Sequence, residues 1–102
     1  MHIIARPAID AAIQKHPDAQ AWLEEWWNRA SKARWHNLAE VRFDYAPTDQ
    51  VDCCLIFDVK GNKYRLICRR TYANEWTQGT LLVKHLLTHA EYDKIKWTRD
   101  CK

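Results

Sequence analysis

The chain has 102 residues, of which 47% are hydrophobic, and it carries a formal net charge of +3. This length suits a single core, so residues 1–102 are predicted to form one domain. Gly occurs twice and Pro three times, which argues against long disordered segments. No apolar run approaches the roughly 20 residues that span a membrane. No secretory pattern follows Met1, and we expect a cytoplasmic protein with no membrane partner.

The cysteines form no metal-binding pattern. The sequence contains no Cys-x-x-Cys pair and no Cys/His spacing typical of a zinc site, and we predict no metal and no other cofactor. Free cysteine behaves as a small apolar side chain, so we expect reduced and mostly buried thiols. A cross-strand disulfide between Cys53 and Cys68 is the alternative. The four cysteines are Cys53, Cys54, Cys68 and Cys101.

The N-terminal third reads as a short strand followed by two helices. Residues 2–5 are predicted to form the strand, because they include two β-branched isoleucines. A helical pattern begins at Arg6 and ends at Pro17. Asp18 is predicted to cap a second helix over residues 18–33. The tight connection between the two helices predicts an αα-hairpin.

Three tryptophans lie in the second predicted helix, at positions 22, 26 and 27. One interpretation is stacking on nucleic acid bases. The other is packing on a sheet, because Trp22 and Trp26 are four residues apart and coincide with the apolar stripe. We favour core packing, with Trp27 as the residue most able to depart from it.

The remainder of the chain reads as a strand meander that ends in a helix. Residues 37–44 are weakly patterned and predict a short turn of helix. The predicted strands are 51–59, 63–72 and 80–88, and the predicted last helix is 90–97. This order predicts an α+β fold with the αα-hairpin packed on one face of an antiparallel sheet. The other sheet face is then an open, concave binding surface.

Two connections join these strands. Lys60-Gly61-Asn62 predicts a tight hairpin turn, in which Gly61 and Asn62 tolerate positive φ. Residues 73–79 predict a looser connection that exposes Trp76.

Basic residues concentrate on the second predicted strand and its turn. The segment 60–70 contains five basic residues and no acid, and these are Lys60, Lys63, Arg65, Arg69 and Arg70. Such a cluster can face a polyanion. It can equally be an edge strand that uses charge to resist aggregation. Strand alternation places Lys63, Arg65 and Arg69 on one face.

Arg65 and His89 are the strongest candidates for chemistry. A mid-strand arginine is either a salt-bridged residue at the rim of a sheet or a rigid bidentate clamp for phosphate. His89 follows the third predicted strand, and Tyr92, Asp93 and Lys94 follow it within one helical turn. Histidine can act as general base or acid near neutral pH, although a lone histidine is commonly structural. RNA cleavage without metal requires a base, cations for the phosphorane and an acid, which this set contains.

The segments Phe57–Ile67 and Leu87–Lys94 closely resemble the HigB group of the RelE superfamily, and the opening Met1–Ile4 is similar to that group as well. The group comprises toxins of bacterial type II toxin–antitoxin pairs. The resemblance implies a RelE-type α+β fold and an mRNA endoribonuclease that acts on the translating ribosome. It also implies a HigA-type helix-turn-helix antitoxin as partner, with operator DNA bound only through the antitoxin complex.

The resemblance also implies roles for particular residues. The catalytic candidates are Arg65, His89, Tyr92 and Lys94. The RNA-binding candidates are Lys63, Arg69, Lys84 and Asp93. Two other functions stay open: a non-catalytic RNA- or protein-binding module with a RelE-like fold, and a DNA-binding regulator that acts only with its partner.

Overall fold

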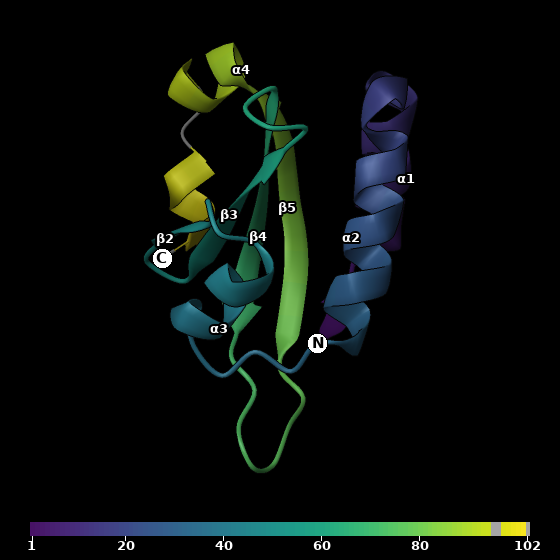
Figure 1. The fold of residues 1–102 in the computed structure, drawn as a ribbon. Helices are drawn as coiled ribbons and strands as arrows, with labels where there is room; N and C mark the ends of the chain where they lie inside the picture. The colour runs from purple at the N-terminus through teal and green to yellow at the C-terminus, as the bar shows by residue number, and fades with distance from the viewer. Residues whose placement is uncertain (95–96, 102) are drawn as a thin grey trace.

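A five-stranded sheet forms the centre of the computed structural model, which describes residues 1–94 and 97–101, without the side chains of residues 100 and 101. The strand order is β1-β5-β4-β3-β2. Neighbouring strands are antiparallel except for β1, which runs parallel to β5 (Figure 1). The strands are β1 (His2–Ile4), β2 (Asp49–Val51), β3 (Cys54–Val59), β4 (Tyr64–Thr71) and β5 (Thr80–Thr88).

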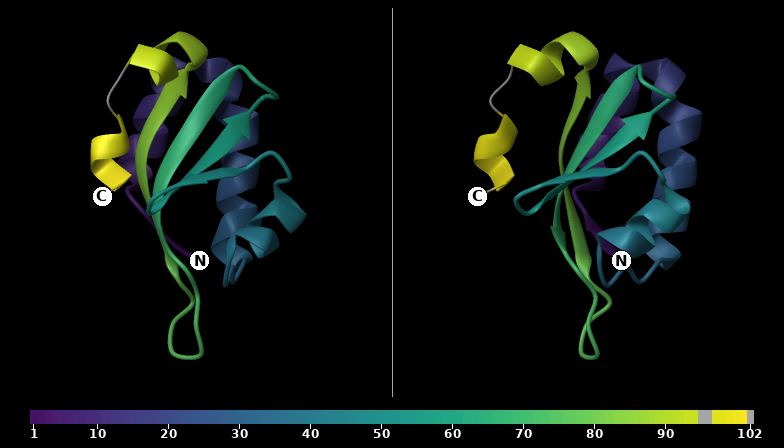
Figure 2. Two further views of the ribbon diagram at one scale, coloured as in Figure 1. Left: turned by 90° about the vertical axis from the view of Figure 1, so that its left-hand side faces the viewer. Right: turned by 60° about the vertical axis from the view of Figure 1, so that its left-hand side comes forward.

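Helices lie on both sides of this sheet. The helices within residues 6–44 pack on one face, and those of residues 89–94 and 97–101 lie on the opposite side (Figures 1 and 2). This arrangement confirms the predicted α+β class. None of the described helices is long and apolar enough to cross a membrane. The helices are α1 (Arg6–Lys15), the 3-10 turn η1 (Pro17–Ala19), α2 (Gln20–Lys32), α3 (Leu38–Asp44), α4 (His89–Lys94) and the 3-10 turn η2 (Trp97–Cys101).

The main core lies between the sheet and the helices α1, α2 and α3. Trp26 of α2 is fully buried, and its ring meets Phe57 of β3 edge-on at a centroid distance of 5.5 Å. Trp22 and Trp27 are half-buried and pack against this core. The guanidinium carbon of Arg6 lies 5.0 Å from the centroid of the Trp27 ring. The prediction of core packing for these tryptophans is therefore confirmed.

A second, smaller core covers the opposite sheet face. Ile56, Ile67 and Leu87 are buried there, and Trp97 packs over them with 6% of its surface exposed. The prediction of an open concave face is therefore wrong in this region. The predicted helix 90–97 is also wrong in its end, because α4 runs from His89 to Lys94 and Trp97 begins η2. Residues 95 and 96 lie outside the described residues.

The strand predictions hold best for β5, whose observed bounds equal those predicted. The predicted strand 51–59 is instead two strands, because Asp52 adopts a positive φ of 50° and turns β2 back onto β3. The second predicted strand begins one residue later, at Tyr64, and ends at Thr71. It lies between β3 and β5, which excludes the interpretation of its charges as protection of an edge strand.

The prediction of positive φ in the first hairpin turn is confirmed for Gly61 and wrong for Asn62. In the β3–β4 turn, Lys60 (54°) and Gly61 (67°) adopt positive φ, and Asn62 does not. Before β5, Gly79 has a φ of 82°. A Cβ atom on Gly79 would lie 2.8 Å from the carbonyl oxygen of Thr71, so only glycine fits there.

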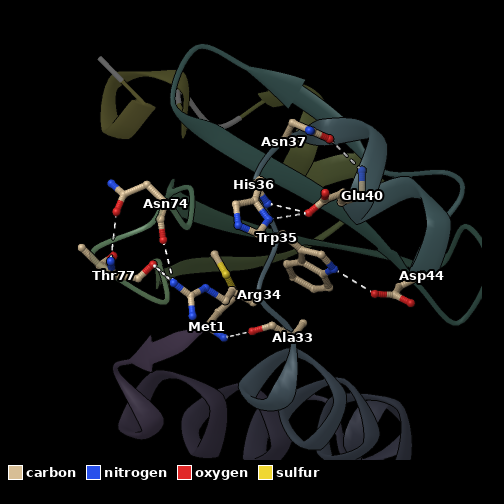
Figure 3. Close-up of polar contacts among 10 residues, drawn as sticks. All are labelled: Met1, Ala33, Arg34, Trp35, His36, Asn37, Glu40, Asp44, Asn74 and Thr77. Carbon is tan, nitrogen blue, oxygen red and sulfur yellow. Dashed lines mark hydrogen bonds and ion pairs between the residues drawn. The ribbon is translucent and has the colours of Figure 1, made fainter.

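A side chain from the α2–α3 linker holds the β4–β5 loop. Arg34 Nη2 donates to the carbonyl oxygens of Asn74 at 2.7 Å and Thr77 at 3.5 Å (Figure 3). Asn74 Oδ1 accepts hydrogen bonds from the backbone N–H groups of Trp76 and Thr77. The loop is therefore ordered although Trp76 is 83% exposed, as the sequence predicts.

The cysteine predictions are confirmed in part. No disulfide joins Cys53 to Cys68, so that alternative is wrong. Cys68 is fully buried, and burial raises the pKa of its thiol. Cys54, by contrast, takes part in a disulfide, and the expectation of a reduced thiol is wrong for this residue. The side chain of Cys101 lies outside the described part of the chain.

Asp18 does not cap α2, contrary to the prediction, because η1 carries it away from the first turn of that helix. Its carboxylate instead accepts hydrogen bonds from Lys63 Nζ and, at 2.8 Å, from the Tyr64 hydroxyl. Lys60 Nζ lies 3.7 Å away. The hydrogen bond from Lys63, followed by that from Tyr64, lowers the pKa of Asp18 to about 2.

We expect Asp18→Asn to weaken the dependence of stability on acid pH. The folded-state pKa lies below the unfolded value of about 3.9. The charged carboxylate therefore contributes stability above about pH 4, and this contribution is lost as the pH falls toward 2. The measurement is the urea midpoint from pH 5 to pH 2. Asp10→Asn, at an exposed position of α1, is the control and should keep the wild-type slope; an unchanged slope in Asp18→Asn contradicts the prediction.

Candidate functional site

Arg65 lies on β4, between β3 and β5, near the end of the sheet where α4 begins. The β-sheet register places it opposite Asp58 of β3 on one side and Leu87 of β5 on the other. Arg65 Nη1 is 3.0 Å from Asp58 Oδ1, and the side chains are 16% and 24% exposed. The salt-bridge interpretation of this arginine is therefore realised. The same contact fixes a guanidinium at a partly shielded position, which a phosphate clamp also requires.

Tyr92 covers this arginine from α4. The Arg65 guanidinium carbon lies 5.6 Å from the centroid of the Tyr92 ring. The Trp97 ring packs on the Tyr92 ring, with 5.0 Å between the two ring centroids. Trp97 Nε1 also donates to the Tyr92 carbonyl oxygen at 3.1 Å. Burial raises the pKa of the Tyr92 hydroxyl, with Asp49 as the next cause. Tyr92 is therefore protonated at neutral pH and can donate a hydrogen bond or a proton.

A capping box fixes the junction between β5 and α4. The Glu91 N–H donates to Thr88 Oγ1 at 3.2 Å, and the Thr88 N–H donates to Glu91 Oε1 at 3.0 Å. The hydrogen bond from the Thr88 backbone lowers the pKa of Glu91. Glu91 Oε2 also lies 3.6 Å from Lys15 Nζ of α1. These contacts make His89 the first residue of α4 and set the direction of the helix that carries Tyr92.

Thr88→Ala should loosen this junction. Loss of an N-cap hydroxyl costs about 1 kcal/mol, and the loss acts on the helix that holds Tyr92 over Arg65. We expect faster amide hydrogen exchange in α4 and little change in the main core, measured by exchange mass spectrometry. Thr80→Ala, at the opposite end of β5, is the control. Equal protection of α4 in the wild type and in Thr88→Ala contradicts the proposed role of the cap.

The other predicted catalytic residues lie near this pair on exposed positions. His89 and Lys94 are exposed on α4, one at each end of the helix. Among the described contacts, no hydrogen bond or ion pair joins His89 to Arg65 or Tyr92. The structure therefore brings Arg65 and Tyr92 together and places His89 and Lys94 at the same end of the sheet without direct contact.

The predicted RNA-binding residues are dispersed. Lys63 lies in the β3–β4 turn and forms an ion pair with Asp18. Arg69 is exposed on β4, toward the other end of the strand. Lys84 is the extra residue of a β-bulge, because the register passes from Ile67–His85 to Cys68–Val83. Asp93 is exposed on α4. These four residues do not form one patch.

Sequence reasoning missed several residues around Arg65. Thr88-His89-Ala90-Glu91 matches the capping-box pattern, so a signal for that junction was present. Asp58 had a weaker signal: it is an acid in a strand that a short turn pairs with the strand of Arg65. Trp97 had none, since its position depends on the direction of the chain after α4.

Two surface hollows are described, and both lie outside the Arg65–Tyr92 pair. A hollow of about 300 Å³ lies between α1 and the end of β5, where its lining includes His16, Lys84 and Glu91. A second, of about 450 Å³, lies on α1. Neither is lined by Arg65 or Tyr92. In the part of the chain that the structure describes, no group of three or more His, Cys, Asp or Glu side chains can hold a metal ion.

Comparison with known proteins agrees with the resemblance read from the sequence. The model of the HigB toxin family, the RelE-like toxic component of a toxin–antitoxin system, matches residues 19–95. The chain is also 26% identical over 98 residues to the mRNA interferase HigB of Escherichia coli O6:H1, a match that covers 93% of this chain and 91% of that protein. The family match spans most of the chain and includes β3, β4, β5 and α4, which form the site, so this protein belongs to the HigB family of RelE-like toxins.

Proposed function

We propose that this protein is an endoribonuclease that cleaves mRNA on the translating ribosome, without a metal ion, and thereby inhibits translation. The observation that carries the proposal is the Arg65–Tyr92 pair at the β5–α4 junction, where a partly exposed cation and a protonated hydroxyl lie together. The relative in Escherichia coli, which is named an mRNA interferase, supports the same activity.

The chemistry follows from the residues at this end of the sheet. Arg65 binds the phosphate and stabilises the charge that develops on it in the transition state. His89 is exposed at the start of α4 and acts as base toward the ribose 2′-hydroxyl. Tyr92 or Lys94 donates to the leaving 5′-oxygen or to the phosphate. Attack by the 2′-oxygen leaves a 2′,3′-cyclic phosphate and a 5′-hydroxyl.

The partner follows from the family. A toxic component of a toxin–antitoxin system has an antitoxin partner. We propose a helix-turn-helix antitoxin of the HigA type, which neutralises the toxin and through which the complex contacts operator DNA.

The proposal is tested with purified protein and a defined mRNA, both on translating ribosomes and free. We expect cuts within the coding region on ribosomes, with 2′,3′-cyclic or 3′-phosphate ends. For the free mRNA, cleavage should be slower and should persist in EDTA. A 3′-hydroxyl product, or activity that appears only with added divalent ion, contradicts the mechanism. RNA binding with no cleavage under any condition indicates a non-catalytic module instead.

A further inference from the structure

Asp58 is the acidic partner of the proposed phosphate-binding arginine. The two residues lie directly opposite each other on β3 and β4, with 3.0 Å between Asp58 Oδ1 and Arg65 Nη1. Both side chains are less than one quarter exposed. The strand neighbour of Arg65 on its other side, Leu87, is buried. In such surroundings a charge is costly without a partner, so Asp58 compensates the burial of Arg65.

The contact occupies only one end of the guanidinium. Arg65 Nη1 is shielded from solvent and is close to the carboxylate, but it lacks the geometry of a hydrogen bond in the described structure. The exposure that Arg65 retains therefore belongs to its other atoms. A guanidinium is a rigid planar fork with five N–H donors. The ion pair lies at Nη1, and no hydrogen bond is described for the other N–H groups of Arg65, which leaves them for a phosphate.

A second contact lies beside the same group. The Tyr92 ring centroid lies 5.6 Å from the guanidinium carbon. The guanidinium is thus confined by a carboxylate at one nitrogen and by a ring beside it. Bidentate binding of phosphate depends on the orientation of the fork, so a group held in this way is oriented before the substrate arrives.

We propose that Asp58 is a positioning residue of the RNA-cleaving site: its carboxylate holds Nη1 of Arg65 and directs the rest of the guanidinium toward the scissile phosphate. This inference rests on the proposed function. The negative charge of Asp58 also lies beside the position of an anionic substrate. Asp58 therefore weakens the binding of RNA in the ground state while it accelerates cleavage of the bound RNA.

Asp58→Asn separates these two effects, because it removes the charge and keeps the size of the side chain. The measurements are single-turnover cleavage of a defined mRNA on ribosomes and binding to the same complex with 2′-deoxyribose in the coding codons. We expect cleavage to slow by on the order of tenfold to a hundredfold, since small misplacement of a reacting group has effects of this size. We expect binding to be as tight as in the wild type, or tighter. Asp58→Glu should recover most of the rate.

Asp52→Asn is the matched control, because it removes the same charge at an exposed position of the β2–β3 turn, and asparagine tolerates the positive φ of 50° found there. It should cleave at the wild-type rate. An unchanged or faster rate in Asp58→Asn overturns the proposal. Parallel losses of binding, cleavage and melting temperature also overturn it, because they indicate a purely structural ion pair.

A measurement without RNA separates this inference from the proposed function. The side-chain N–H signals of Arg65 in NMR spectra report the rotation of its guanidinium. We expect separate, slowly exchanging signals in the wild type and averaged signals in Asp58→Asn. Averaged signals in both proteins overturn the positioning role. If the wild type shows separate, slowly exchanging signals but cleaves no RNA, the proposed function fails and the orientation of Arg65 by Asp58 stands.

Discussion

Arg65→Ala should cleave RNA at least about a hundredfold more slowly than the wild type. Removing one group that stabilises developing charge in a transition state costs about 2.7–4 kcal/mol, which corresponds to this rate loss or a larger one. In this protein the substitution also removes the cation beside the Tyr92 ring. The measurement is single-turnover cleavage of a defined mRNA on ribosomes, with circular dichroism to confirm the fold.

Arg69→Ala is the control for this substitution. Arg69 is exposed and lies on the same strand as Arg65, four residues away. Its substitution by alanine removes the same charge. We expect it to weaken RNA binding by a few-fold in a salt-dependent manner and to leave the rate of the bound step unchanged. A folded Arg65→Ala protein that cleaves at the wild-type rate would reduce Arg65 to the structural partner of Asp58.

Trp26→Ala should have the largest effect on stability. The side chain is fully buried and meets Phe57 edge-on. Truncating a buried tryptophan costs about 3–5 kcal/mol, because transfer energy is lost and a cavity remains. For a domain of this size, the melting temperature falls by on the order of 10–30 °C. Thermal and urea unfolding measure the change.

Two variants sharpen this result. Trp26 Nε1 is buried without a hydrogen-bond partner in the described residues. Trp26→Phe removes that unsatisfied donor while it keeps an aromatic ring, so it should cost less than half as much as Trp26→Ala. Trp76→Ala, at an 83% exposed position, should change stability by less than about 0.5 kcal/mol. Similar losses in Trp26→Ala and Trp76→Ala contradict the assigned core.

The sequence predicts those parts of the fold that depend on local periodicity. The bounds of β5 follow from its two apolar runs, residues 81–83 and 86–87, and the burial of Trp26 follows from its place on the helical stripe. Asp18 shows where this reasoning ends. The carboxylate of Asp18 could cap a helix or form tertiary contacts, and in the structure it accepts hydrogen bonds from Lys63 and Tyr64 of the β3–β4 hairpin. That choice requires knowledge of which distant segment lies beside η1.

The candidate site can likewise be predicted from the sequence only in part. Arg65 and Tyr92 can be selected from the sequence because each follows a recognisable turn or strand end. Their contact cannot, because it depends on the register of β4 with β5 and on the direction of α4. Asp58 has a weak signal in the short β3–β4 turn, but its place directly opposite Arg65 requires the β3–β4 register. The packing of Trp97 on Ile56, Ile67 and Leu87 is also a long-range contact, which local periodicity does not predict.

Mapping RNA 5′ ends in bacteria after induction of this protein tests the central claim most directly. The wild type should arrest growth and produce new 5′-hydroxyl ends within translated regions. Arg65→Ala, accumulated to the same level, should produce neither effect, and Arg69→Ala should produce both. Continued growth with intact mRNAs, while the folded wild-type protein is abundant, would contradict the account.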